Sequence, residues 1–175
     1  MRILITYAST EGQTRKICRF AADHLVDQGH SVELLDVRDA EGLELGRFDA
    51  AVLAGSVHVG KIQPELLDFA NENGAVLRKL KTLYLQVSGA AAGKDPQEWA
   101  DLRKIADTAA REFGWHPGRT EHIAGAFRFT EYDFFKSLAM RWIASQHGQT
   151  VDPHQDTEFT DWAALTRILD DWAAG

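Results

Sequence analysis

The chain is poor in the residues that mark several protein classes. It has one cysteine and four prolines among 175 residues, so no disulfide can form within it and a disulfide-rich secreted domain is excluded. No apolar run approaches the ~18 residues of a membrane-spanning helix, and the run from Ile3 to Ile5 is too short for a signal peptide. Cys18 falls on the apolar face of a predicted helix. We therefore expect a cytoplasmic protein with a buried, reduced cysteine.

Positive charge is also scarce. Lys and Arg number 19 against 26 Asp and Glu, which gives a formal net charge of -7. A nucleic-acid surface needs clustered basic side chains, so we expect no nucleic-acid partner. The length and the hydrophobic content of 45% suit one domain with a sizeable core. Residues 1–175 are therefore interpreted as a single domain whose partner is a small molecule or a protein.

Apolar strands alternate with amphipathic helices along the chain. Strands are predicted at 3–7, 31–36, 50–54, 82–87 and 119–127, and helices at 14–28, 64–79, 97–113 and from 162 onward. The continuous apolar run at 50–54 is typical of a parallel sheet covered on both faces. The pattern predicts an α/β fold with a doubly wound five-stranded parallel sheet in the order 2-1-3-4-5. Its ligand is expected beyond the carboxyl ends of strands one, three and four.

One segment, residues 129–153, exceeds what this fold needs between its fifth strand and last helix. Large apolar side chains recur in it at helical spacing: Phe134, Phe135, Leu138, Ala139, Trp142 and Ile143. The spacing predicts an inserted amphipathic helix. Two interpretations stay open, extra core against the sheet or a surface that contacts a membrane or partner.

The first predicted strand leads directly into a hydroxyl-rich loop that opens a helix. The loop and the first helical residues are Ser9, Thr10, Glu11, Gly12, Gln13 and Thr14. Unpaired N–H groups at a helix N-terminus, with short hydroxyl donors and one glycine, can hold a phosphate monoester. Neither the Rossmann nor the Walker spacing fits. The loop resembles the phosphate loop of flavodoxins, which holds the phosphate of FMN; the alternative is an ordinary turn rich in N-cap residues.

Two further loops follow the third and fourth predicted strands. The second contains Ser56, Val57, His58, Val59 and Gly60, and the third begins Ser88, Gly89, Ala90 and continues to Lys94. Backbone donors there can tune a flavin ring, and His58 is expected to contact the flavin or the substrate. Each loop alone is a weak signal. Together, at strand ends where this topology places its ligand, they predict an FMN site.

Two other users of this topology lack their functional residues here. A receiver domain needs an acidic pair after the first strand and an aspartate after the third, where this chain has Ser9-Thr10 and Gly55-Ser56. A low-molecular-weight tyrosine phosphatase needs a cysteine in the first loop, and Cys18 lies within the helix. Both functions are excluded.

The loops and one later run extend the resemblance over nearly the whole chain. The run is Ile123-Ala124-Gly125-Ala126-Phe127-Arg128-Phe129, followed by Tyr132 and by Thr160-Asp161-Trp162. With the first two loops, it resembles the menaquinone-dependent protoporphyrinogen oxidases of bacteria. That resemblance implies a flavodoxin-like fold, noncovalent FMN, and oxidation of protoporphyrinogen IX to protoporphyrin IX in heme biosynthesis. It also implies a membrane quinone as the electron acceptor. Under the second interpretation of 129–153, that segment would hold the protein peripherally at the inner face of the cell membrane.

Cationic side chains near the expected site are candidates for binding the propionates of the porphyrinogen. They are Lys61, Lys94 and Arg128, of which Arg128 is preferred because its planar fork matches a carboxylate. No general base stands out, and no metal is expected. The rival hypothesis is a flavodoxin-type electron carrier, or a quinone reductase that uses another donor. The sequence does not choose the quinone or the oligomeric state.

Overall fold

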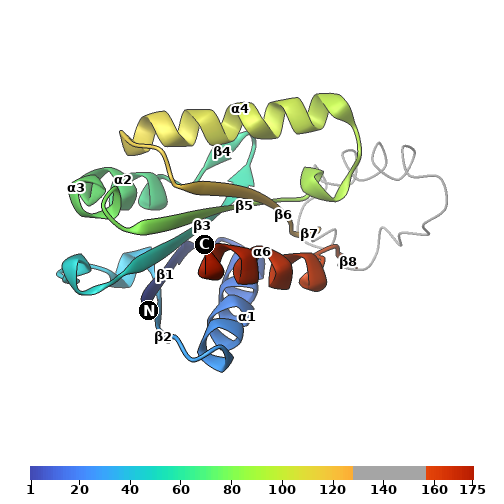
Figure 1. The fold of residues 1–175 in the computed structure, drawn as a ribbon. Helices are drawn as coiled ribbons and strands as arrows, with labels where there is room; N and C mark the ends of the chain where they lie inside the picture. The colour runs from blue at the N-terminus through green and yellow to red at the C-terminus, as the bar shows by residue number, and fades with distance from the viewer. Residues whose placement is uncertain (128–156) are drawn as a thin grey trace.

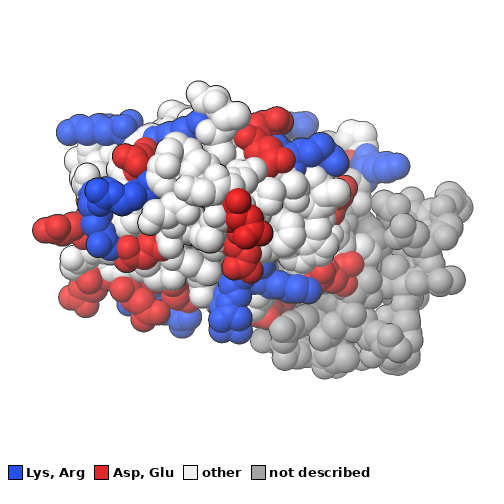
Figure 2. Space-filling view, turned by 60° about the horizontal axis from the view of Figure 1, so that its bottom comes forward, with Lys and Arg blue, Asp and Glu red and all other residues white. Residues whose placement is uncertain are grey.

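The computed structural model describes residues 1–127 and 157–175, traced in Figure 1. Arg128 and the inserted helix predicted at 129–153 lie outside the described residues. Of the described helices, none is long and apolar enough to cross a bilayer. Figure 2 shows Lys and Arg interspersed with Asp and Glu over the face it presents.

A parallel sheet forms the centre of the molecule. Its strands are β1 (Arg2–Ala8), β2 (Ser31–Asp36), β3 (Ala50–His58), β5 (Lys81–Ser88) and β6 (Arg119–Ala124), in the order β2-β1-β3-β5-β6. Because β5 and β6 are the fourth and fifth long strands, this confirms the predicted order 2-1-3-4-5. The short β4 (Lys61–Ile62) pairs antiparallel with β3, and β7 (Ala126–Phe127) pairs with β8 (Thr157–Glu158).

Helices cover both faces of the sheet (Figure 1). One face carries α1 (Gln13–Asp27) and α6 (Trp162–Ala174), and the other carries α2 (Pro64–Glu72), α3 (Gly74–Leu77) and α4 (Pro96–Phe113). Short 3-10 turns occur at Val37–Asp39, Leu45–Arg47 and Ala90–Ala92. Cys18 is fully buried in the α1 and α6 layer, where burial raises the pKa of its thiol. That agrees with its predicted place in the core.

The prediction of one continuous helix at 64–79 is wrong. Helix α2 ends at Glu72, and a separate turn, α3, begins at Gly74. Trp115 causes the break: its indole N–H donates to Ala70 O at 2.9 Å, and a Cβ on Gly74 would lie 2.9 Å from the Trp115 ring. The indole therefore lies against the chain where a continuous helix would place a side chain.

The predicted ends of two strands are also corrected. The strand predicted at 50–54 runs on to His58, so most of the second loop is strand followed by a tight turn. The strand predicted at 119–127 ends at Ala124. Gly125 N–H still donates to Ser88 O of β5, but Gly125 O accepts from Phe159 N–H instead, both at 3.0 Å. Beyond Gly125 the chain leaves β5 and pairs with β8 instead.

Candidate functional site

The carboxyl ends of β1, β3, β5 and β6 meet around a small cavity of about 70 Å³. Its lining combines all three predicted loops with the start of β7: Glu11, Gln13, Thr14, Ser56, Val57, His58, Val87, Ser88, Gly89, Gly125 and Ala126. Parallel pairing brings these residues together, since Ala8 lies opposite Gly55, and Ser56 lies opposite Val87. The cavity is therefore at the sheet edge where the topology predicts a ligand.

The N-terminus of α1 has the features of an anion site. Gly12 begins it with φ 90°, no side chain caps it, and its first turn holds no acidic residue. Ser9 Oγ accepts from Gly12 N–H at 3.0 Å, which fixes the loop before the helix. By contrast, Asp95 caps α4 and Asp161 caps α6. The first turn of α1 thus keeps its N–H donors and partial positive charge for a ligand.

A side chain that sequence reasoning missed joins the first two loops. Gln63 Oε1 accepts from Ser56 N–H at 3.0 Å, and Gln63 Nε2 donates to Ser56 Oγ and, at 3.5 Å, to Thr10 Oγ1. Gln63 precedes Pro64, which opens α2. The amide therefore holds the end of β3 beside the phosphate loop. A polar residue directly before a helix-opening proline was the signal in the sequence, but it does not reveal a partner seven residues back.

The turn between β3 and β4 contains the one residue other than glycine with positive φ in the described chain. Val59 has φ 49° and Gly60 has φ 73°, and the turn joins the paired residues His58 and Lys61. This is the pattern of a type I′ hairpin, in which Asn-Gly is the favoured pair. Val59 is 87% exposed. A β-branched apolar residue therefore occupies a strained position at the mouth of the site.

The third side of the cavity is built from the end of β5 and the start of β7. Ser88 Oγ accepts from Ala91 N–H at 3.2 Å, so the turn at Ala90–Ala92 folds back over the strand. Gly125 is packed closely, because a Cβ there would lie 3.0 Å from Val87 Cγ1. The residues that line this side, Gly89, Gly125 and Ala126, are all small.

The residues after 156 return to the phosphate loop. Thr160 is buried, and its hydroxyl donates to Ala124 O at 2.7 Å while accepting from Gln13 Nε2 at 3.0 Å. The Glu158 carboxylate accepts from Lys16 Nζ at 2.5 Å and from Trp162 Nε1 at 3.0 Å. Burial raises the pKa of Glu158, but hydrogen bonds from Lys16, Gln13 and Trp162 outweigh it and hold the pKa below its ordinary value. The start of α1 is thereby tied to β8.

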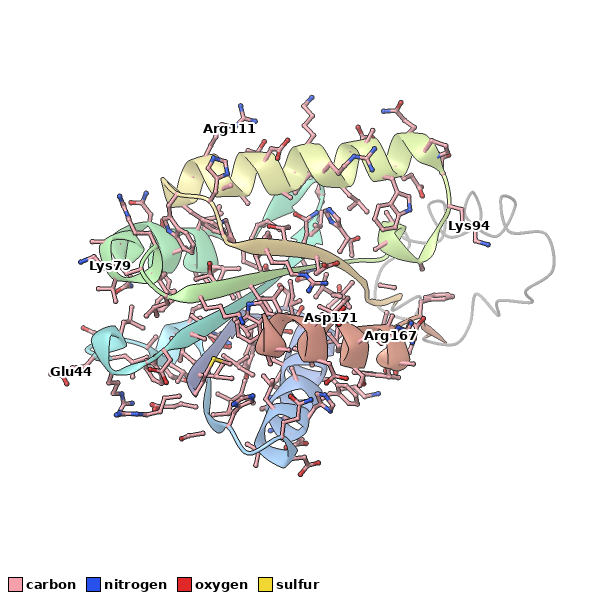
Figure 3. All side chains as sticks on the ribbon, viewed as in Figure 1. Glu44, Lys79, Lys94, Arg111, Arg167 and Asp171 are labelled. Atoms are coloured by element: carbon pink, nitrogen blue, oxygen red, sulfur yellow. The ribbon has the colours of Figure 1, made fainter. Side chains whose placement is uncertain are left out.

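The structure places most, but not all, of the predicted site residues at this cavity. Glu11, Gln13, Thr14, Ser56, Val57, His58, Ser88 and Gly89 line it, whereas Ser9, Thr10, Gly12, Val59, Gly60 and Ala90 lie in the surrounding loops. Lys61 lies on β4, where it lines a different cavity. Figure 3 shows Lys94 pointing outward from the turn before α4. Sequence reasoning did not assign Val87, Gly125 or Ala126 to the lining.

The chemistry of this site suits a phosphate monoester beside a planar group. The first turn of α1 supplies N–H donors and hydroxyls, and the lining elsewhere is small or apolar. Within residues 1–127 and 157–175, no three His, Cys, Asp or Glu side chains are placed to hold a metal ion. The uncapped first turn of α1 fits a single phosphate group, such as the one that FMN carries.

Comparison with solved structures shows the same fold in flavodoxins. Oxidised flavodoxin 1 of Bacillus cereus aligns with a TM-score of 0.61 at 15% identity, over 99% of this chain and 98% of that one. A Streptococcus pneumoniae flavodoxin aligns with a TM-score of 0.59 at 16% identity, over 99% of both chains.

Curated relatives match along nearly the whole sequence. The quinone-dependent protoporphyrinogen IX dehydrogenase of Escherichia coli K12 is 24% identical over 96% of this chain and 92% of its own length. A protein of the same name from Leishmania major is 23% identical over 99% of this chain and 75% of its own length. The sequence model of the flavodoxin domain matches residues 4–154. With this match over most of its length, the chain belongs to the flavodoxin domain family.

Proposed function

We propose that the protein binds FMN and oxidises protoporphyrinogen IX to protoporphyrin IX, with a quinone as electron acceptor. The observation that best supports FMN as the cofactor is the uncapped first turn of α1. This turn lies beside the small cavity and follows a hydroxyl-rich loop. Family membership supports the same choice, because solved flavodoxins share the fold. The ends of β3 and β5 then flank the flavin ring.

The substrate proposal is supported by the curated relatives, which match almost the full chain, including the part that a minimal sheet does not need. The Gly125-Ala126 pair, part of the run that carries the resemblance, lines the cavity. Small side chains there leave room for a flat macrocycle to approach. Those two observations favour a protein with its own substrate.

When bound, FMN would accept two electrons at a time from the donor and pass them to a quinone, so the six-electron oxidation of one protoporphyrinogen IX would take three cycles and three quinones. The chain's own residues bind and orient the reactants. The N–H groups of the first turn of α1 hold the phosphate, and Gln63 keeps Ser56 and Thr10 together. Lys61 and Lys94, both exposed, are proposed to bind the propionates. Arg128, outside the described residues, keeps the same role as a sequence prediction.

An anaerobic assay tests the reaction. Purified protein is loaded with FMN, mixed with protoporphyrinogen IX, and followed by porphyrin fluorescence with and without quinone. We expect fluorescence to rise only with enzyme and quinone together, and Arg128→Ala to lower turnover more than FMN affinity. A rate no faster than that without enzyme contradicts the substrate proposal. Release of FAD instead of FMN on denaturation contradicts the cofactor proposal.

A flavodoxin-type electron carrier is the second candidate function. The alignments with this chain cover 98% and 99% of the length of the two flavodoxins. The fold alone therefore does not require a substrate. Stopped-flow measurement of FMN reduction separates the two functions. Fast reduction by porphyrinogen favours the dehydrogenase, and fast reduction by a reduced ferredoxin reductase alone favours the carrier.

Contact with a membrane through residues 129–153 is a proposal from the sequence alone. Replacing Phe135 and Trp142 with serine is expected to lower binding to anionic liposomes while FMN stays bound. Unchanged liposome binding contradicts the membrane role, and loss of FMN with cooperative unfolding indicates that the segment is part of the core.

A further inference from the structure

A second cavity, of about 700 Å³, lies between α2 and α4 beside β4. Apolar side chains from all three elements line it, among them Ile62, Leu67 and Ile105. Leu67 and Ile105 are partly buried and Ile62 is buried, so they form a floor packed on the core. Lys61 and Lys104 are exposed, as are Asp101 and Glu112, and all four line the same cavity. It is an apolar groove with a solvated charged rim.

The β3–β4 hairpin joins this groove to the cofactor cavity. Val57 and His58 line the cofactor cavity, whereas Gly60 and Lys61 line the groove. Val59 lies between these two pairs in the chain; the residue is 87% exposed and its backbone has φ 49°. Asparagine would relieve this strain and remove the exposed apolar surface. A strained and exposed valine in the hairpin that borders both cavities is a reason to look for an apolar ligand there.

We propose that Val59 and the α2–α4 groove bind the polyprenyl tail of the quinone acceptor, with its ring on the cofactor side of the hairpin. This proposal rests on the proposed function. A membrane quinone is a polar ring on a long apolar chain, so a protein that accepts it needs an apolar surface continuous with its redox site. The groove is an apolar surface that borders the same β3–β4 hairpin as the cofactor cavity. Its volume lies within the range of about 300–1,000 Å³ usual for small-molecule sites.

The test compares two quinones with the same ring, one with a polyprenyl tail and one without. Ile105→Asn places a polar group on the groove floor, and Ala106→Asn is the matched control because Ala106 lines a different cavity, between α4 and β6. We expect Ile105→Asn to raise KM for the tailed quinone roughly five- to tenfold. Its KM for the tail-less quinone and its FMN affinity stay at the wild-type values. Ala106→Asn changes neither KM.

A binding measurement independent of turnover completes the test. A tailed quinone carrying a photoreactive group on the tail is irradiated with the FMN-loaded protein, and the labelled peptide is mapped. Labelling of α2, α4 or the hairpin, reduced in Ile105→Asn, supports the proposal. Labelling elsewhere, or an equal rise in KM for both quinones, overturns it. Failure of the wild-type protein to reduce either quinone contradicts the proposed function instead, so the two failures are distinguishable.

Discussion

Gly12 and Val59, two of the residues with positive φ around the cofactor cavity, differ in kind. Gly12, with φ 90°, opens α1 in a conformation that glycine adopts without strain. Val59, with φ 49°, holds a conformation that strains a β-branched residue. At Gly12, residue type, backbone and proposed ligand agree. At Val59 the backbone has a conformation that valine disfavours. Backbone strain beside the cofactor cavity is a reason to look for a function there. The four predictions that follow test this difference.

Gly12→Val has the largest expected effect. The substitution places a β-branched residue at φ 90° and brings a side chain beside the phosphate cradle. We expect a stability loss of about 1–3 kcal/mol and FMN binding weakened by roughly ten- to a hundredfold. Fluorescence titration with FMN measures the affinity, and urea unfolding measures the stability.

Gly42→Val is the matched control. Gly42 has φ 75°, and no described atom lies within 4 Å of a Cβ built there. It therefore carries similar backbone strain away from the site. Comparable loss of stability with unchanged FMN affinity is expected. If both variants lose FMN equally, strain alone explains the effect and the assignment of the phosphate loop is wrong.

Gln63→Leu removes the hydrogen bonds that join the phosphate loop to the end of β3. Ser56 N–H loses its acceptor, and Thr10 Oγ1 and Ser56 Oγ lose a donor. We expect a stability loss of about 1–2 kcal/mol and weaker FMN binding, measured as above. Gln97→Leu is the control, because Gln97 Nε2 donates to Asp101 Oδ1 on the same exposed helix face, so a change within about 0.5 kcal/mol is expected. Equal losses in both variants would mean that the Gln63 hydrogen bonds contribute nothing.

Val59→Asn is expected to stabilise the protein. Asparagine tolerates the positive φ of this turn, so the free energy of unfolding rises by about 1 kcal/mol. The variant also removes the exposed isopropyl group, so turnover with a tailed quinone is expected to fall as stability rises. Thermal unfolding and quinone kinetics measure the two effects. A variant that is neither more stable nor impaired would show that Val59 is unstrained and has no function.

Glu158→Gln has the smallest expected effect. It acts beside the start of α1, where the phosphate is proposed to bind. The pKa of Glu158 is lowered in the folded protein, so its contribution is full above the ordinary value of 4.5 and is lost as the pH falls through the folded value. Its side chain is 32% exposed, so we expect less than about 1 kcal/mol. Urea midpoints between about pH 7 and pH 3 should therefore fall slightly less in the variant than in the wild type. An identical pH dependence contradicts the role of the Lys16 ion pair.

The sequence by itself determined the sheet and the edge that carries the site. Apolar runs and crossover helices give the strand order, and Thr160-Asp161 marks the start of α6, where Asp161 Oδ1 accepts from Ala164 N–H at 2.8 Å. These features depend on periodicity and on neighbours a few residues apart. The sequence also predicts that the loops after β1, β3 and β5 lie together, because parallel strands end at the same edge of the sheet.

Only the tertiary structure decided the contacts between distant segments. Trp115 ends α2 across 45 residues, and Thr160 joins Ala124 to the phosphate loop across 36 residues. Gln63 selects Ser56 as its partner because β4 turns back on β3. Leu67 and Ile105 line the same groove because α4 packs beside α2. Local patterns do not encode these pairs, because each depends on how separate elements pack and not on the preferences of either segment.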